Sequence, residues 1–120
     1  MESQFTKDDF EIKHNISNYQ EGKITINNTI YKHSLILTET QEIKKWDITN
    51  ISEINEKVLD FLYLKDFILI IGTGAKHRQL DLTILAKSRI NAEIMSTKSA
   101  CQTYTILAQE QRSVIAALII

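Results

Sequence analysis

The sequence lacks several features that would narrow its function at once. It has no proline and a single cysteine in 120 residues, so an internal disulfide framework is excluded. Its net charge of −1 provides no overall field that would draw the chain toward nucleic acid or an anionic membrane. The longest apolar runs, residues 67–71 and 114–120, are far too short to span a bilayer. The absence of proline and the abundance of asparagine, isoleucine and lysine indicate a compositional bias, which says nothing about mechanism.

The first nine residues are polar and acidic, with Glu2, Asp8 and Asp9 among them. A secretory signal needs an apolar run, and a mitochondrial presequence should be rich in arginine and poor in acidic residues, so we expect neither. The chain is therefore expected to be cytoplasmic and not inserted in a membrane. Its length predicts a single domain over residues 1–120, with residues 1–9 as a flexible tail.

The first half of the chain alternates apolar and polar residues, which is typical of half-buried strands. We expect strands over residues 10–16, 23–26 and 31–37, and a short strand over residues 42–46. Gly22 permits a turn after the first strand, since glycine adopts positive φ freely. The pair Asn27-Asn28 fits a tight hairpin, because asparagine tolerates the left-handed region.

The second half changes to apolar residues at three- and four-residue steps, interrupted by apolar runs. The pattern predicts helices over residues 52–65 and 78–88, a third helix starting at Ser96 or Thr97, and strands over residues 67–71, 92–95 and 114–120. Ser52 is the expected N-cap of the first helix. The second helix is expected to bury Leu82, Leu85 and Ala86. The third carries an apolar stripe that consists of Ala100, Cys101, Tyr104, Leu107 and Ala108.

This order of elements predicts an α/β fold with three layers. A β-rich front followed by alternating helices and strands indicates a central mixed, mostly parallel sheet with helices on both faces, plus an N-terminal antiparallel β layer. The continuous apolar runs at residues 67–71 and 114–120 are typical of strands covered on both faces, and we expect the second of them to be central.

Two segments of the second half also carry a resemblance to a known family. Residues 70–74 read Ile-Ile-Gly-Thr-Gly, and residues 93–107 contain Glu-x-Met-x-Thr-x-x-Ala-Cys-x-Thr-Tyr-x-x-Leu. Arg112, the triplet at 116–118 (Ala-Ala-Leu), Trp46 and the Gly22-x-Ile24 hairpin also fit. The sequence resembles the family that includes the mitochondrial complex I (NADH dehydrogenase) assembly factor 3 and the adipogenesis-associated protein, with many uncharacterised bacterial members. The resemblance covers residues 16–120 and implies the three-layer mixed-sheet fold.

The chain departs from the family pattern at several positions. Gln102 stands where the family usually has arginine, and Thr105 where it usually has asparagine. Arg89 and Gln111 stand where glycine is typical, and the prolines near the Gly-Thr-Gly turn are missing. If the arginine of the family contacts an anionic ligand, that contact is not carried over to Gln102. The resemblance implies no enzyme, because the best-understood relatives look like assembly or scaffold proteins.

Two strand–helix junctions form the candidate ligand-binding site. The candidate residues are Gly72, Thr73 and Gly74 at the first junction and Met95, Ser96 and Thr97 at the second. Glycine-rich turns let backbone N–H groups approach an anion. If the two preceding strands are neighbours, the junctions flank one crevice at the carboxyl ends of parallel strands, where open α/β sheets bind ligands. The alternatives are a tight turn required by the fold at the first junction and ordinary N-capping at the second.

Cys101 and Tyr104 complete the candidate set. A thiol about one turn into a helix can have a lowered pKa and become nucleophilic. Cys101 falls on the apolar stripe, however, which favours a buried structural cysteine. Tyr104 serves either function or packing. The three histidines have no metal-ligand spacing among themselves or with Cys101, so we expect no metal site. We also expect no cofactor and no catalytic residues.

Two functions from different classes follow. The first is a non-catalytic binding or assembly module related to respiratory complex assembly. It rests on the resemblance and predicts a protein partner, either a membrane-complex subunit or a second copy of the chain. The second is a small-molecule or anion-binding protein, with an enzyme as one form of it, that uses the crevice at the two junctions. The nearly balanced charge argues against nucleic acid as a partner.

Overall fold

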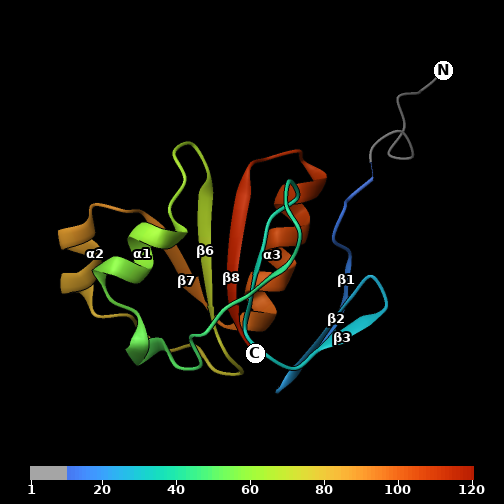
Figure 1. Cartoon of the computed structure of the whole chain (residues 1–120), viewed down its shortest axis with the longest axis horizontal. Coiled ribbons are helices and arrows are strands. Elements are labelled where there is room, and N and C mark those ends of the chain that lie inside the picture. Colours follow the sequence, from blue (N-terminus) through green and yellow to red (C-terminus); the bar gives the residue numbers. More distant parts are fainter. Residues whose placement is uncertain (1–10) are drawn as a thin grey trace.

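The computed structural model describes residues 11–120, which form two β-sheets and three α-helices (Figure 1). The predicted tail, residues 1–9, and Phe10 lie outside the described residues. The smaller sheet consists of β1 (Ile16–Gln20), β2 (Lys23–Ile26) and β3 (Thr29–Tyr31). The larger sheet consists of β4 (Leu35–Leu37), β5 (Lys44–Lys45), β6 (Ile68–Thr73), β7 (Ala92–Met95) and β8 (Val114–Ile119). The helices are α1 (Glu56–Leu62), α2 (Leu82–Ser88) and α3 (Thr97–Gln109), with a 3-10 turn at Ile51–Glu53.

The larger sheet has the strand order β5-β4-β8-β6-β7 and is mixed. β6 runs parallel to both β7 and β8, whereas β4 is antiparallel to β8 and to β5. Figure 1 shows β6 and β8 side by side at the centre of the molecule. The prediction of a central, mostly parallel sheet with residues 114–120 in its middle is confirmed.

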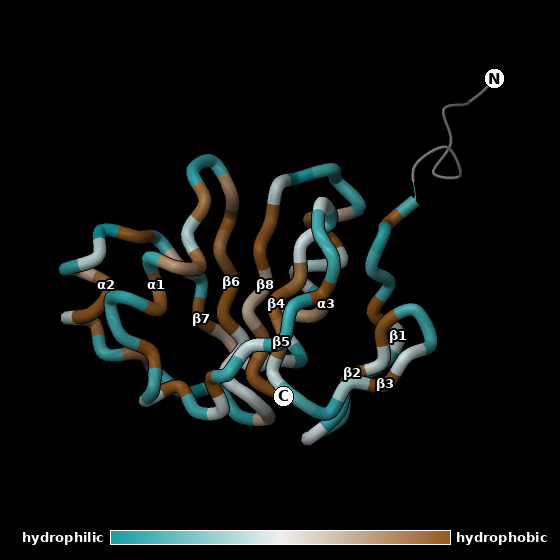
Figure 2. The backbone as a smooth tube through the Cα atoms, in the orientation of Figure 1, coloured by the Kyte–Doolittle hydropathy of each residue, from teal (hydrophilic) through white to brown (hydrophobic). Residues whose placement is uncertain are grey.

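The two central strands are almost entirely apolar because both of their faces are covered. Alternate residues of a strand point to opposite faces. Ile70 and Leu118 pack with α3 and the smaller sheet, whereas Ile71 and Ala117 pack with α1 and the residues around α2. Figure 2 shows the hydrophobic colour concentrated along β6 and β8. The predicted layers, with helices on both faces and an N-terminal antiparallel layer, are therefore confirmed.

The smaller sheet is an antiparallel meander closed by two tight turns. Gly22 has φ of 88° in the first turn, and Asn27 and Asn28 have φ of 50° and 69° in the second. Positive φ at both central residues is the signature of a hairpin turn whose twist suits its strands. Ile24 and Ile26 of β2 are fully buried against the α3 side of the core. Both turn predictions are confirmed.

The predicted strand over residues 10–16 is wrong in extent, since β1 begins at Ile16. In the residues before β1, backbone N–H and C=O groups form hydrogen bonds with side chains rather than with a neighbouring strand. The Glu39 carboxylate accepts hydrogen bonds from the N–H groups of Lys13 and His14, at 2.6 and 3.2 Å. The Asn27 amide donates to the Lys13 carbonyl at 2.8 Å. Alternation of residue types cannot distinguish such an extended segment from a strand.

The predicted strand over residues 31–37 is divided between two sheets. β3 ends at Tyr31 and β4 begins at Leu35, so the chain crosses from the smaller to the larger sheet between them. The Ser34 carbonyl there accepts a hydrogen bond from the Trp46 N–H at 2.9 Å. The strand expected over residues 42–46 is reduced to the two residues of β5.

The helix predicted over residues 52–65 is two shorter pieces, and Ser52 is not an N-cap. Asn50 caps the 3-10 turn, and the Glu53 carboxylate accepts a hydrogen bond from the Asn50 N–H to complete a capping box. Asn55 then caps α1 by accepting from the Val58 N–H at 3.0 Å. Asparagine is as good an N-cap as serine. The second cap therefore allows α1 to begin at Glu56, three residues after the 3-10 turn ends at Glu53.

The helix predicted over residues 78–88 begins four residues later than expected. Asp81 caps α2 through the Thr83 N–H, and Thr73 accepts from the Arg78 N–H, which holds the preceding residues in a turn. Leu82 is 77% exposed and Ala86 is also exposed, so the prediction that the helix buries them is wrong. With the later start, Leu85 remains half-buried and packs against the core, together with its neighbour Ile84.

Candidate functional site

The structure brings the two predicted junctions together at one rim of the larger sheet. β6 and β7 are parallel neighbours, and Gly72 of the first lies beside Met95 of the second. Their carboxyl ends therefore point the same way, as expected. Ser96 is the N-cap of α3 and accepts a hydrogen bond from the Ser99 N–H at 3.4 Å. Thr97 is the first helical residue rather than the cap.

The Thr97 side chain occupies the space between the junctions. Its Oγ1 accepts a hydrogen bond from the Gly74 N–H at 2.8 Å and donates one to the Ile119 carbonyl at 2.5 Å. The Thr97 N–H donates in turn to the Gly74 carbonyl at 2.9 Å. Thr97 is fully buried. One hydroxyl thus ties the end of β6, the start of α3 and the end of β8.

Gly72 shows how closely these segments approach. A Cβ atom on Gly72 would lie 2.7 Å from Thr97 Oγ1 and 3.0 Å from Thr97 Cα, with Leu118 at 3.1 Å. Contacts below 3.0 Å essentially never occur for real Cβ atoms, so glycine is required here. Gly74 instead has φ of 101°, and a Cβ atom there would make only an ordinary contact with Ile119 at 3.9 Å. A packed side chain therefore stands where a crevice was expected, and ligand binding at these six junction residues stays a prediction.

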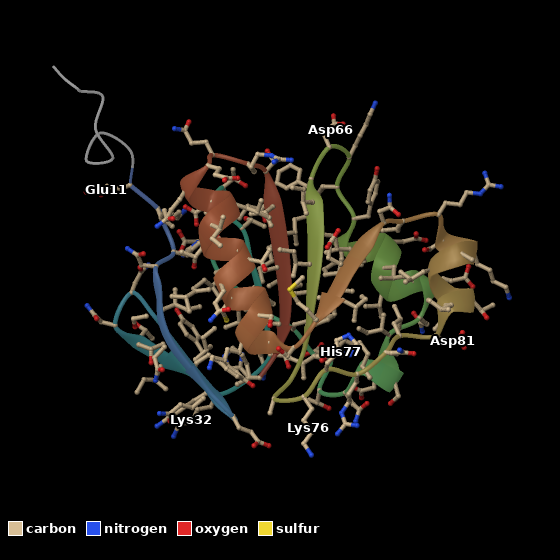
Figure 3. The ribbon with its side chains drawn as sticks, turned by 180° about the vertical axis from the view of Figure 1, so that it is seen from behind. Glu11, Lys32, Asp66, Lys76, His77 and Asp81 are labelled. Atoms are coloured by element: carbon tan, nitrogen blue, oxygen red, sulfur yellow. The ribbon has the colours of Figure 1, made fainter. Side chains whose placement is uncertain are left out.

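The outer part of the first junction is a turn held by Thr73. The Thr73 hydroxyl donates to the Lys76 carbonyl at 2.6 Å and accepts from the Arg78 N–H at 3.1 Å. Lys76 and His77 are exposed, and Figure 3 shows Lys76 projecting away from the body of the molecule. The basic side chains lie outside the space that Thr97 fills.

A hollow lies elsewhere, along the side of α3 and next to the smaller sheet. It has a volume of about 630 Å³ and is lined by residues 16–19 of β1 and by Lys98, Cys101, Gln102, Thr105 and Ile106 of α3. We call it the β1–α3 groove. Of the predicted residues it contains Cys101. The other residues that line the groove were missed because sequence alone does not place β1 beside α3. The available signal was that Lys98, Gln102 and Ile106 recur at four-residue steps and so share one face of a helix.

Cys101 is only 6% exposed at the floor of the groove. Burial raises the pKa of its thiol from the ordinary 9.0 to about 12. The thiol is therefore protonated at neutral pH. Its burial on the apolar stripe affects its pKa more than its closeness to the helix N-terminus does. Cys101 packs with Ala100 and Tyr104 in the core on this face of the sheet.

Tyr104 lies outside the groove and joins α3 to the end of β4. Its hydroxyl donates a hydrogen bond to the Glu39 carboxylate, which also accepts from the Lys13 and His14 N–H groups. Burial, and then the Glu39 bond and charge, raise the pKa of the Tyr104 hydroxyl. A hollow of about 270 Å³ adjoins this cluster, with Lys13, Glu39 and Arg112 in its wall. The geometry gives Tyr104 a structural contact, and its part in ligand binding stays a prediction.

The described residues hold no group of three or more histidine, cysteine, aspartate or glutamate side chains placed to bind a metal ion. None of the helices within residues 11–120 has the length and apolar character needed to cross a membrane.

Known proteins resemble the chain in sequence and in fold. It is 35% identical over 101 residues to the "13 kDa major membrane protein" of Francisella tularensis, and the matched region covers 80% of this chain and 82% of that protein. It is 30% identical over 112 residues to the "NADH dehydrogenase [ubiquinone] 1 alpha subcomplex assembly factor 3" of Drosophila melanogaster, which covers 87% of this chain. The chain spans 57% of the length of that fly relative.

The fold is also that of a solved structure. A protein of Bordetella parapertussis superimposes with a TM-score of 0.79 at 24% identity, over 91% of this chain and 97% of that one. The matching family model, described as "Protein of unknown function (DUF498/DUF598)", extends over residues 16–119 and so includes both sheets and all three helices of the described part. The chain therefore belongs to the DUF498/DUF598 family, as the sequence motifs predicted.

Proposed function

We propose that the chain is a non-catalytic protein-binding module that assists the assembly of a membrane-associated respiratory complex. The observation that carries the proposal is the 30% identity to a fly protein named as an assembly factor, extending over 87% of this chain. The chain spans 57% of that relative, so the proposal concerns the part that the two proteins share. A membrane-complex subunit is the proposed partner.

Several large apolar side chains are available for such a partner. Phe61 is 70% exposed, and Tyr63 and Leu64 beside it are 44% and 45% exposed. Phe61 and Leu64 also line a hollow of about 150 Å³ at the edge of the larger sheet. Clustered exposed apolar residues commonly mark interaction surfaces. We place the module in the cytoplasm, docked on a membrane complex through protein contacts, which also accommodates a relative named as a membrane protein.

Deletion of the gene in its own host tests the proposal. We expect membranes of the deletion strain to contain less fully assembled NADH dehydrogenase complex on native gels, and the wild-type gene to restore it. A gene carrying Gly72→Val is the control that should not restore it, because the added side chain meets the Thr97 backbone. Unchanged complex assembly in the deletion strain would remove the support for this function.

The second candidate function is binding of a small molecule or anion. The β1–α3 groove favours it, because its volume of about 630 Å³ lies within the range typical of ligand sites and Lys98 stands on its wall. The two junctions remain the other proposed location. Thermal-shift screening against nucleotides, phosphates and carboxylates tests both, since a ligand at a hundredfold excess over its Kd stabilises by about 2.7 kcal/mol. Absence of any shift across the panel argues against this function.

The proposal also includes a second copy of the chain as a partner. Sedimentation equilibrium over a range of concentrations tests this, with a single species at the monomer mass of 13.8 kDa as the result that excludes a stable homodimer.

A further inference from the structure

The inference concerns the free edge of the smaller sheet. β1 pairs with β2 on one side, and no strand within residues 11–120 pairs with its other side. In an antiparallel ladder every second residue of an edge strand turns its N–H and C=O groups away from its neighbour. Such an edge is a template for another extended chain. The register of β1 also shifts between Ile16 and Asn18, which leaves Ser17 without a partner in the ladder.

This free edge borders the β1–α3 groove. Residues 16–19 supply one wall, and α3 supplies the other. Figure 3 shows β1, in blue, and α3, in orange, side by side at the front of that view. An edge strand facing a helix across a groove is the arrangement in which peptides are bound by strand addition.

The chemistry of the walls suits a peptide with particular side chains. Ile16 and Cys101 provide apolar surface, and Ile106 is 55% exposed on the α3 wall. Lys98 is exposed and forms no ion pair with any residue of the described part. The Gln102 amide, one turn farther along α3, can both donate and accept hydrogen bonds.

Tyr19 gives an independent sign that a polar partner is missing. Its hydroxyl is buried and has no hydrogen-bond partner among residues 11–120, although the ring lines the groove. Buried polar groups in proteins nearly always have such a partner. The Tyr19 ring therefore offers aromatic surface to a peptide in the groove, beside a hydroxyl that the fold leaves unpaired.

We propose that the β1–α3 groove binds an extended peptide segment of a partner protein, which adds to β1 as a fourth strand of the smaller sheet. Apolar side chains of the peptide pack against Ile106 and Cys101, and an acidic residue pairs with Lys98. This proposal rests on the proposed function as a protein-binding module and names the partner segment and its site. Other occupants of the groove, such as a small molecule or a second copy of the chain, are separate outcomes of the test.

The test begins with a displayed library of random eight-residue peptides, selected on the whole chain. We expect enriched peptides with alternating apolar residues and at least one acidic residue, binding with Kd values of micromolar order. In ¹⁵N-labelled protein, a synthetic peptide of this kind should shift the backbone amide signals of β1 and of the α3 wall.

Two pairs of variants separate groove binding from general surface binding. Lys98→Glu and Ile106→Glu change the groove, whereas Lys87→Glu and Leu82→Glu make the same changes on exposed residues of α2. We expect each groove variant to weaken peptide binding about tenfold and each control to leave it within about twofold. Thermal unfolding of all four variants checks that they are folded.

Backbone methylation tests the added strand itself. Two versions of a binding peptide are made, one N-methylated at its odd-numbered residues and one at its even-numbered residues. One version should lose binding and the other should bind nearly as well as the unmethylated peptide, because only one set of N–H groups faces β1. Equal binding of both versions would overturn strand addition. Strand addition is also wrong if no enriched peptide depends on Lys98 and Ile106, or if only small molecules or a second copy occupy the groove.

Cellular assembly distinguishes the failure of this inference from the failure of the proposed function. If deletion impairs complex assembly but the Lys98→Glu/Ile106→Glu gene restores it fully, the assembly role stands and the peptide groove does not. If peptides bind as expected but deletion leaves assembly unchanged, the groove stands and the respiratory role is wrong.

Discussion

The hydroxyl of Thr97 contributes more to this fold than its place at a helix start indicates. It satisfies one backbone donor, the Gly74 N–H, and one backbone acceptor, the Ile119 carbonyl, in a fully buried position. Buried backbone groups left without partners carry a large penalty, whereas the same groups near water do not. The threonine therefore acts as an internal clamp between three elements.

Replacement of Thr97 by valine should lower the free energy of unfolding by about 2 to 4 kcal/mol, because the isosteric side chain leaves two buried backbone groups unpaired. Thr97→Ser retains the hydroxyl and should cost less than the valine variant. Urea unfolding of the two variants and the wild type provides the comparison. A valine variant as stable as the serine variant would show that the hydrogen bonds contribute little.

Sequence could identify a capping position here but not the clamp. Ser96 or Thr97 was predictable as the cap because both residues suit that role locally. The Thr97 partners lie 23 and 22 residues away, and the Glu39 partner of Tyr104 lies 65 residues away. Contacts between such distant residues leave no periodic signal, so this part of the candidate site could not be predicted.

At the scale of single elements, two helix ends carry a mild strain. Arg89 caps α2 with φ of 60°, and Gln111 follows α3 with φ of 61°. The Arg112 N–H donates to the Leu107 carbonyl at 2.9 Å, which is the closing bond of a Schellman motif. Glycine is the residue that this conformation favours, and it is the residue the family resemblance expects at both positions.

We expect Arg89→Gly and Gln111→Gly each to raise the free energy of unfolding, by about 0.5 to 1 kcal/mol, and to do so additively because they cap different helices. Lys87→Gly is the matched control, since glycine inside the last turn of α2 should instead cost up to about 1 kcal/mol. Chemical denaturation of the single and double variants measures these effects. If both glycine substitutions destabilise the protein, the native Arg89 and Gln111 side chains make contacts that outweigh the backbone strain.

Elements with strong periodicity were the predictable ones. The bounds of β2 and β7 agree with the sequence prediction, and those of β6 and β8 differ by one or two residues. The segment at residues 31–37 was predicted as one strand because Tyr31, Leu35 and Leu37 face the same core, although they belong to two sheets. The start of α2 was misplaced because the turn that precedes it depends on the Thr73 side chain.

At the scale of the whole molecule, three weakly acidic side chains within residues 11–120 pack together in the core on the α3 side, namely Tyr19, Cys101 and Tyr104. Burial raises the pKa of Cys101 to about 12, and burial with the Glu39 contact raises the pKa of Tyr104. Burial, followed by the proximity of Cys101 and Glu21, raises the pKa of Tyr19. Each group is neutral when protonated, so the folded state holds its proton more tightly than the unfolded state does. For Cys101 the resulting stabilisation is complete below pH 9 and is lost as the pH rises toward 12.

We therefore expect the free energy of unfolding to fall steeply above pH 9, with Cys101 contributing about 2 to 4 kcal/mol of the loss by pH 12. Cys101→Ala should be less stable at pH 7, since it removes a packed side chain, but its stability should decline less over the same pH interval. Unfolding curves at intervals of half a pH unit measure both slopes. Parallel slopes for the two proteins would contradict a protonated, buried thiol.

The layered architecture was predictable because continuous apolar runs require cover on both faces, and β6 and β8 have that pattern. The groove was not predictable, because its walls come from opposite ends of the chain. Gln102 was singled out as a departure from the family pattern, yet nothing in the sequence indicated that β1 lies across from it.

The position of β8 has a consequence for how the protein is made. This strand joins β4 to β6, but it is translated after every other strand of the larger sheet. While the ribosome is still adding residues 114–119, the apolar side chains of β6 lack the neighbour that will shield them. Nascent chains with such exposed segments are prone to aggregate and are typical clients of chaperones. Closure of the sheet must therefore wait until β8 has left the exit tunnel.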